Sequence, residues 1–89
     1  MITLFVRHTV ADYAAWRKAY DAYGPVQTEM GVKAQAVYRS IDDPNDVTVT
    51  HEFETAEEAR AMLSSADLRS KMQEAGVTGA PTVWFASKV

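Results

Sequence analysis

Residues 47–54 read VTVTHEFE, and the pattern of this stretch decides the fold. Valine, histidine and phenylalanine occupy every second position, with threonine or glutamate between them, a period of two that is typical of a half-buried strand. Five turn-forming residues, 42–46 (DDPND), come before the stretch, and a capping-box sequence, 55–58 (TAEE), follows it. We therefore expect the second strand of a hairpin, leading directly into a helix.

Three further strands are expected around this one. Residues 2–8 and 32–40 alternate with the same period of two. Residues 82–86 (TVWFA) form a short apolar run after the turn-forming stretch 79–81 (GAP). The hairpin joins the second and third of the four strands.

A helical segment separates the first two strands. Asp12 is a suitable N-cap, because its carboxylate can accept hydrogen bonds from the first-turn amides. Aromatic residues then recur at steps of three and four up to Tyr23, which is the spacing of one helix face. Gly24-Pro25 predicts a kink, with a continuation to about Gly31.

A second helical segment follows the capping box. We expect it to break at Ser64-Ser65, to restart with Ser65 as a cap and to end at Gly76. With short connections and right-handed crossovers, the order predicts an α+β, ferredoxin-like βαββαβ fold. Its antiparallel sheet has the order 4-1-3-2, with the helices on one face. The chain shows no linker, repeat or low-complexity tract, so residues 1–89 are expected to form a single domain.

The composition excludes several classes of function. The chain has 89 residues, no cysteine and a net charge of −3, so disulfides, thiolate chemistry and Cys-ligated zinc are excluded. An acidic chain is a poor partner for nucleic acid. No apolar run approaches the roughly 20 residues of a membrane span, and no charged leader precedes the first strand. We expect a cytoplasmic protein with no nucleic-acid or membrane partner.

The two faces of the predicted sheet indicate a second copy of the chain. The helix-facing side is expected to carry Ile2, Leu4, Val6, Val47, Val49, Phe53, Val83 and Phe85. The opposite face carries Phe5, Val37 and Trp84, and burying such a side chain is worth about 1.5–3 kcal/mol. We therefore predict a homodimer that packs sheet against sheet, with Arg7 and Arg39 at its rim. The alternative is scattered surface apolar residues, which are common.

A pocket is expected between the sheet and the first helix. If Ser40 pairs with Val47, then Ala34 and Ala36 lie on the helix-facing side of the edge strand, next to His51. Their small side chains leave space that either a helix aromatic or a ligand fills. The candidate aromatic lining is Tyr13, Trp16, Tyr20 and Tyr23. Plain core packing is the alternative for these aromatic residues.

Two histidines supply candidate acid–base groups. His8 and His51 fall on the same face of neighbouring strands, and histidine is the side chain that titrates near neutral pH. The structural alternative is that each only bonds a tyrosine or a backbone carbonyl. A metal would need a carboxylate ligand, but Glu52 and Glu54 point to the other face. Glycine-rich phosphate loops are also missing, so neither a metal nor a cofactor is expected.

The sequence resembles small proteins of the dimeric α+β barrel superfamily, in the branch of antibiotic biosynthesis monooxygenase-like proteins that includes proteins labelled cyclases. The resemblance rests on residues 8–13 (HTVADY) with Trp16, on 42–45 (DDPN) before a valine-rich strand, and on Leu68, Met72 and 75–77 (AGV). It implies two ferredoxin-like subunits that join their sheets into a barrel, each with a pocket between sheet and helices. Haem-degrading relatives use an Asn, Trp and His constellation, and the first strand here has no Asn.

The resemblance implies a cofactor-independent monooxygenase or a polyketide cyclase-like enzyme. The ligand would be a small aromatic or polyketide-like molecule, with His51 as the general base that forms a phenolate or enolate. Tyr20 and Tyr38 would orient the ligand and donate hydrogen bonds to the developing oxyanion. The residues that would contact the substrate are His8, Tyr13, Trp16, Ala34 and Ala36. The rival hypothesis is a non-catalytic ligand-binding or stress-related dimer.

Overall fold

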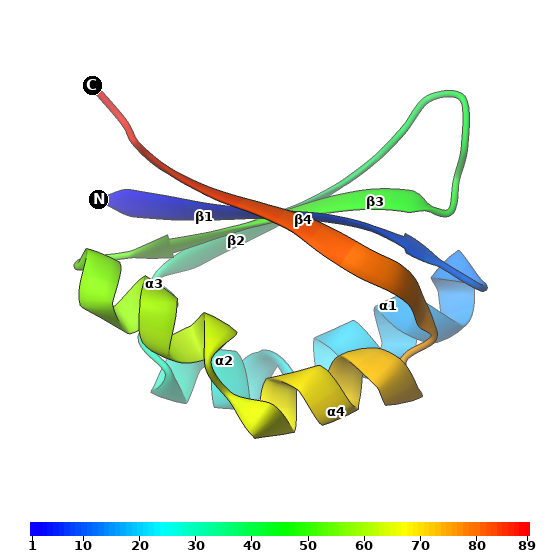
Figure 1. The fold of residues 1–89 in the computed structure, drawn as a ribbon, viewed down its shortest axis with the longest axis horizontal. Helices are drawn as coiled ribbons and strands as arrows, with labels where there is room; N and C mark the ends of the chain where they lie inside the picture. Colours follow the sequence, from blue (N-terminus) through cyan, green and yellow to red (C-terminus); the bar gives the residue numbers. More distant parts are fainter.

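Four antiparallel strands form one sheet in the order β2-β3-β1-β4, and all the helices cover one of its faces (Figure 1). The structure is a computed structural model that describes residues 1–89. Its elements are β1 (Ile2–Val10), α1 (Tyr13–Ala22), α2 (Gly24–Glu29), β2 (Ala34–Arg39), β3 (Asp46–Phe53), α3 (Ala56–Leu63), α4 (Ala66–Glu74) and β4 (Val77–Ser87). The predicted ferredoxin-like fold and strand order are confirmed.

The helix ends follow the capping chemistry of the sequence. The Asp12 carboxylate accepts from the Ala15 amide, and the Thr55 hydroxyl accepts from the Glu58 amide. Ser65 caps α4 in the same way. Pro25 lies in the first turn of α2, where its missing N–H costs no hydrogen bond. These predicted breaks divide each helical crossover into two short helices.

The central strand β1 and the edge strand β4 are longer than predicted. Their pairing continues to Val10 opposite Val77, past a shift in register between Arg7 and Thr9. Gly79 has a φ of +71° at this irregularity, a conformation that glycine adopts without strain. Pro81 is tolerated because β4 is an edge strand. A bulge with glycine therefore carries the sheet beyond the point where the alternation of the sequence ends.

The expected register of the hairpin is wrong by one residue. Arg39, not Ser40, lies opposite Val47, because Asp46 belongs to β3 and its carbonyl accepts from the Ser40 amide. Asp46 is held in the strand by a bidentate pair with Arg7, with an Arg7 Nη2 to Asp46 Oδ2 distance of 2.6 Å. A slip of one residue moves every side chain of β2 to the opposite face of the sheet.

This slip changes the predicted positions of six side chains. Ala34, Ala36 and Tyr38 face away from the helices, since they lie opposite Glu52, Thr50 and Thr48. Gln35, Val37 and Arg39 take the helix-facing side.

The slip also removes Val37 from the predicted dimer interface. Val37 packs against the core, on the face of the sheet that the helices cover. Arg39 likewise leaves the expected rim and lies over the Tyr13 ring, 4.2 Å from its centroid.

The core forms between the centre of the sheet and the helices. Leu4, Val47 and Phe53 are its largest completely buried side chains. Met62 of α3 and Trp16 of α1 close it from the helix side. Phe85 has the orientation expected from its pairing with Leu4, yet it is 40% exposed. The helices therefore leave the C-terminal part of β4 uncovered.

The outer face of the sheet carries an aromatic pair, and no helix covers it (Figure 1). Phe5 and Trp84 are cross-strand partners, as predicted, and their rings stack with centroids 5.1 Å apart and an interplanar angle of 2°. Trp84 is still 42% exposed. A large apolar pair on the β1–β4 side of an open sheet face is typical of an interaction surface.

None of the helices combines the length and the apolar character needed to cross a bilayer.

Replacing Phe53 tests the position of the core. Phe53→Ala should lower the free energy of unfolding by about 3–5 kcal/mol, because it leaves a cavity in a closed core. Phe85→Ala is the matched control and should cost clearly less, since that ring is 40% exposed. Urea unfolding followed by circular dichroism measures both. Equal losses in the two variants would contradict this placement of the core.

Candidate functional site

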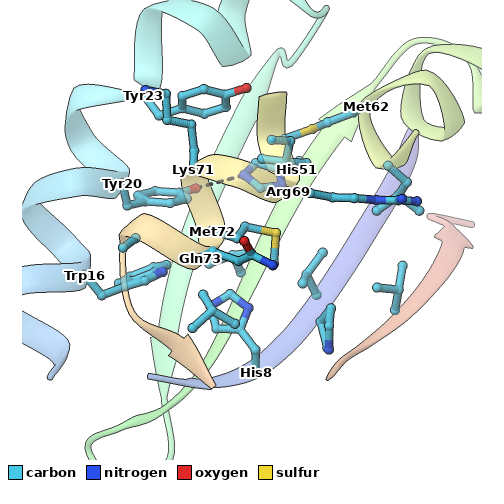
Figure 2. A pocket seen from close by; sticks show the side chains of 18 of the residues that line it. His8, Trp16, Tyr20, Tyr23, His51, Met62, Arg69, Lys71, Met72 and Gln73 are labelled. Carbon is cyan, nitrogen blue, oxygen red and sulfur yellow. Dashed lines mark hydrogen bonds between the residues drawn. The ribbon is translucent and has the colours of Figure 1, made fainter. Parts of the chain in front are cut away.

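A cavity of about 520 Å³ lies between the sheet and the helices. Its floor is formed by β1, β3 and β4, its sides by α1 and α3, and α4 covers it (Figure 2). The lining is mostly apolar, and its volume is in the range of pockets that hold drug-sized ligands. The cavity extends toward β4, whereas the pocket was predicted beside β2.

The polar centre of the cavity is a bond between β3 and α1. The Tyr20 hydroxyl lies 2.9 Å from His51 Nε2, as the dashed line in Figure 2 shows. The same hydroxyl lies 2.6 Å from Gln35 Oε1. A hydroxyl has one proton, so when Tyr20 donates it to Gln35, His51 Nε2–H donates to Tyr20. In this arrangement the proton of the neutral imidazole is on Nε2, and Nδ1 carries a free lone pair.

His51 has no other partner. Its side chain is buried, and Nδ1 makes no hydrogen bond within the chain. Burial disfavours the charged imidazolium and lowers the pKa of His51 to about 4. Burial also raises the pKa of Tyr20 to about 12, partly offset by the neighbouring Gln27 amide and Arg17. At neutral pH the pair is therefore an uncharged imidazole and a protonated phenol.

Aromatic rings connect the pair to the far end of the cavity. Tyr20 stacks on Trp16 at a centroid distance of 4.8 Å, and Trp16 meets His8 edge to face at 5.6 Å. His8 is buried and lies opposite Val47 on β1, on the same sheet face as His51, as predicted. Burial lowers the pKa of His8, and a weaker attraction by Asp46 opposes this. Tyr13 packs on the outer side of Trp16 and does not line the cavity.

Helix α4 covers the cavity without being embedded in the core. None of its residues is fully buried, and the side chains of Leu68 and Met72 form part of the apolar lining of the cavity. Tyr23 OH donates to Asp67 Oδ2 at 3.0 Å, which fixes the start of α4 against α1. Arg69 and Lys71 border the cavity as exposed residues (Figure 2), and Lys71 Nζ lies 3.6 Å from Glu74 Oε2. An uncharged and mostly apolar interior favours a mainly apolar ligand.

The structure brings together only part of the predicted site. His8, Trp16, Tyr20 and His51 line the cavity. Tyr38 is 59% exposed on the outer sheet face, and the two alanines of β2 lie on that face as well, so none of the three contributes to it. Each of these misplacements follows from the one-residue slip of β2.

The sequence analysis missed several lining and supporting residues. Gln35 supports the tyrosine only because of the observed register of β2. Gln27 of α2 is buried, and its Oε1 makes no hydrogen bond. Leu68 and Met72 stand at i and i+4, and the sequence analysis used them for the resemblance alone and not as lining residues. No group of three or more metal-ligating side chains gathers in the structure.

The burial of His51 predicts how stability depends on pH. Between pH 6.5 and about 4, the unfolded chain binds a proton at His51 that the native protein does not bind. Stability is therefore greatest above pH 6.5 and falls by up to about 3 kcal/mol as the pH drops to 4, with His8 acting in the same direction.

Urea unfolding at several pH values, with His51→Gln as the control, measures this dependence. The stability of the wild type relative to the variant should rise from pH 4 to pH 6.5. A difference that stays constant over this interval would contradict a native imidazole with a lowered pKa.

Comparison with known proteins identifies the fold. No protein-family profile matches the chain, and no curated protein matches it in sequence. A structure described as a candidate antibiotic biosynthesis monooxygenase from Bordetella bronchiseptica superposes with a TM-score of 0.85 and 21% identity, covering 99% of this chain and 96% of that one. A similarly described protein from Nitrosomonas europaea has a TM-score of 0.77 and 16% identity, covering 100% and 99%.

A protein described as a cofactor-independent oxygenase has the same fold. SnoaB from Streptomyces nogalater, a cofactor-independent oxygenase, superposes with a TM-score of 0.75 and 15% identity, covering 99% of this chain and 94% of that one. The full-length structural neighbours are thus antibiotic biosynthesis monooxygenase-like proteins, and the resemblance noted in the sequence is confirmed at the level of the fold.

Proposed function

We propose that each subunit of a homodimer binds a small aromatic or polyketide-like molecule in its cavity, and that His51 removes a proton from it. One observation carries the proposal. His51 lines an apolar cavity of about 520 Å³, and its buried, neutral imidazole is bonded at Nε2 by Tyr20 while Nδ1 has no partner within the chain. A ligand hydroxyl or an enolisable C–H next to Nδ1 would supply the missing contact and the proton.

Proton transfer in this site favours an acidic substrate. Moving a proton from an ordinary phenol with a pKa of about 10 to an imidazole with a pKa of about 4 costs about 8 kcal/mol. The resulting imidazolium–phenolate pair at about 4 Å returns about 4 kcal/mol at an effective dielectric constant of about 20. A carbonyl conjugated to the hydroxyl or next to the C–H lowers the remaining cost. Hydroxylated ring ketones and β-polyketones meet this requirement.

Tyr20 would act as a positioning residue. Its hydroxyl bonds Nε2 and so keeps the proton away from Nδ1, and it can stabilise the imidazolium once that has formed. Gln35 holds the tyrosine from the other side. Tyr38 has no part in this mechanism, because it lies on the opposite face of the sheet.

Two reactions can follow the same deprotonation. In a monooxygenation, the substrate anion reacts with O₂, and a ring CH₂ becomes C=O while the second oxygen atom leaves as water. In a cyclisation, the anion attacks a second carbonyl of the same molecule, and O₂ is not consumed. The cofactor-independent oxygenase SnoaB, which shares the fold at 15% identity, supports the first reaction as the one to test.

The low pKa of His51 favours a second candidate function. An imidazole with a pKa of about 4 is a weak base, and the same cavity without turnover would be a non-catalytic binding site for these ligands. A ligand that binds and dissociates chemically unchanged would support this function.

Replacing His51 tests the catalytic proposal. With 1,8-dihydroxyanthrone as substrate, wild-type protein should consume one O₂ for each anthraquinone formed. His51→Gln should reduce the rate at least about 100-fold, because general-base catalysis is typically worth that much. Tyr20→Phe is expected to have a smaller effect. An oxygen electrode with product analysis measures these rates, and a full rate in His51→Gln would refute the assignment.

Replacing Trp84 tests the dimer. Trp84→Ala removes one ring of the stacked pair on the uncovered face and should shift sedimentation equilibrium from dimer toward monomer. Tyr38→Phe, which keeps a ring on the same face, is the control. A Trp84→Ala dimer as strong as that of the wild type would rule out association through this face.

A further inference from the structure

The proposed reaction uses one histidine of the cavity and leaves the other without a role. The His8 side chain is 7% exposed, and neither Nδ1 nor Nε2 has a hydrogen-bond partner. Leaving a buried polar group unpaired costs about 1–3 kcal/mol, and most buried polar groups are paired for this reason. The neighbouring Asp46 cannot compensate, since its carboxylate is paired with Arg7 on the outer face.

His8 is also held in a defined orientation. Trp16 contacts its ring edge to face, with an interplanar angle of 64°. Val47 lies beside it on β3 and is completely buried. The imidazole therefore stands between an aromatic ring and the core, and its remaining open side is the cavity that it lines (Figure 2). No group of the chain bonds its nitrogens, so the cavity that the ring lines is the place from which a ligand group would reach them.

The distance between the two histidines sets the length of a ligand that contacts both of them. His51 lies opposite Leu4, and His8 is four residues farther along β1. At about 3.3 Å per residue, the two backbone positions are about 13 Å apart along the strands. The floor between them is apolar, formed by Leu4, Val6 and Val49. A single ring with one hydroxyl bonds one histidine and leaves the other unpaired.

We propose that His8 is a second recognition residue, and that the ligand is at least two fused rings long with a hydroxyl or carbonyl at each end. One polar end meets His51 and the other meets His8, while the apolar rings lie over the valines and Leu4. This inference rests on the proposed function, because it specifies the ligand of the same cavity. It makes His8 a determinant of ligand length and polarity.

Calorimetric titration with 2-naphthol and 2,6-dihydroxynaphthalene tests the inference. The two probes share one ring system, and only the second has a hydroxyl at each end. The wild type should bind the diol up to about tenfold more tightly, the value of one additional net hydrogen bond. In His8→Phe this ratio should fall to about one. Equal affinities in the wild type, or an undiminished ratio in His8→Phe, would overturn the inference.

A thermal measurement separates recognition from a structural role. His8→Phe keeps the ring against Trp16 and removes two unpaired nitrogens, so the ligand-free variant should melt a few degrees higher than the wild type. A lower melting temperature would mean that His8 serves the fold, and would overturn the inference. If the wild type binds neither probe, the proposed function fails together with this inference. Binding of both probes with equal affinity removes the inference alone.

Discussion

The pairing of β3 with both of its neighbours is the constraint on which the rest of this structure depends. His51 lies opposite Leu4 on one side and Gln35 on the other, so one register brings a base, an apolar floor and a supporting amide to the same level of the sheet. Asp46 is the first residue of β3, and its carboxylate forms an ion pair with Arg7 on the outer face of the sheet. A slip of one residue would place Gln35 on the outer face and leave Tyr20 with His51 alone.

The cavity combines this precise sheet with loosely packed helices. Its floor includes completely buried residues, whereas α4 has none, so the site is least constrained on the side of α4. The fold also tolerates buried polar atoms of His8, Gln27 and His51 without partners. In a small domain with a thin core, the free-energy cost of these unpaired atoms is large. A ligand that forms hydrogen bonds with them on binding would remove this cost.

The sequence was sufficient to predict the fold and the sheet face on which the two histidines lie. The alternation in 47–54, the Asp12 and Thr55 caps and the breaks near Pro25 and Ser65 are local signals, and the structure has all of them. His8 and His51 were placed on one face correctly, because a strand repeats every two residues. The stacked pair Phe5 and Trp84 followed from the same rule.

The prediction that failed was the side-chain placement on β2, which depended on the register of the β2–β3 hairpin. In 32–40 polar and apolar residues occur on both faces, so the alternation does not distinguish one register from the next. In the observed register Asp46, a turn-forming residue, belongs to β3, where its carbonyl accepts from the Ser40 amide and its carboxylate pairs with Arg7 of β1. Contacts of this kind between distant segments are not visible in a local pattern, and Tyr38 and Gln35 exchanged faces for this reason.

The most direct test of the account is the tautomer of His51 in the ligand-free protein. Imidazole nitrogens that are protonated or bare have distinct ¹⁵N chemical shifts, and two chain histidines can be assigned with single substitutions. At pH 7 the account predicts a neutral ring with its proton on Nε2, bonded to Tyr20, and a bare Nδ1. A proton on Nδ1, or a charged imidazolium at this pH, would contradict the role of His51 as the base of the cavity.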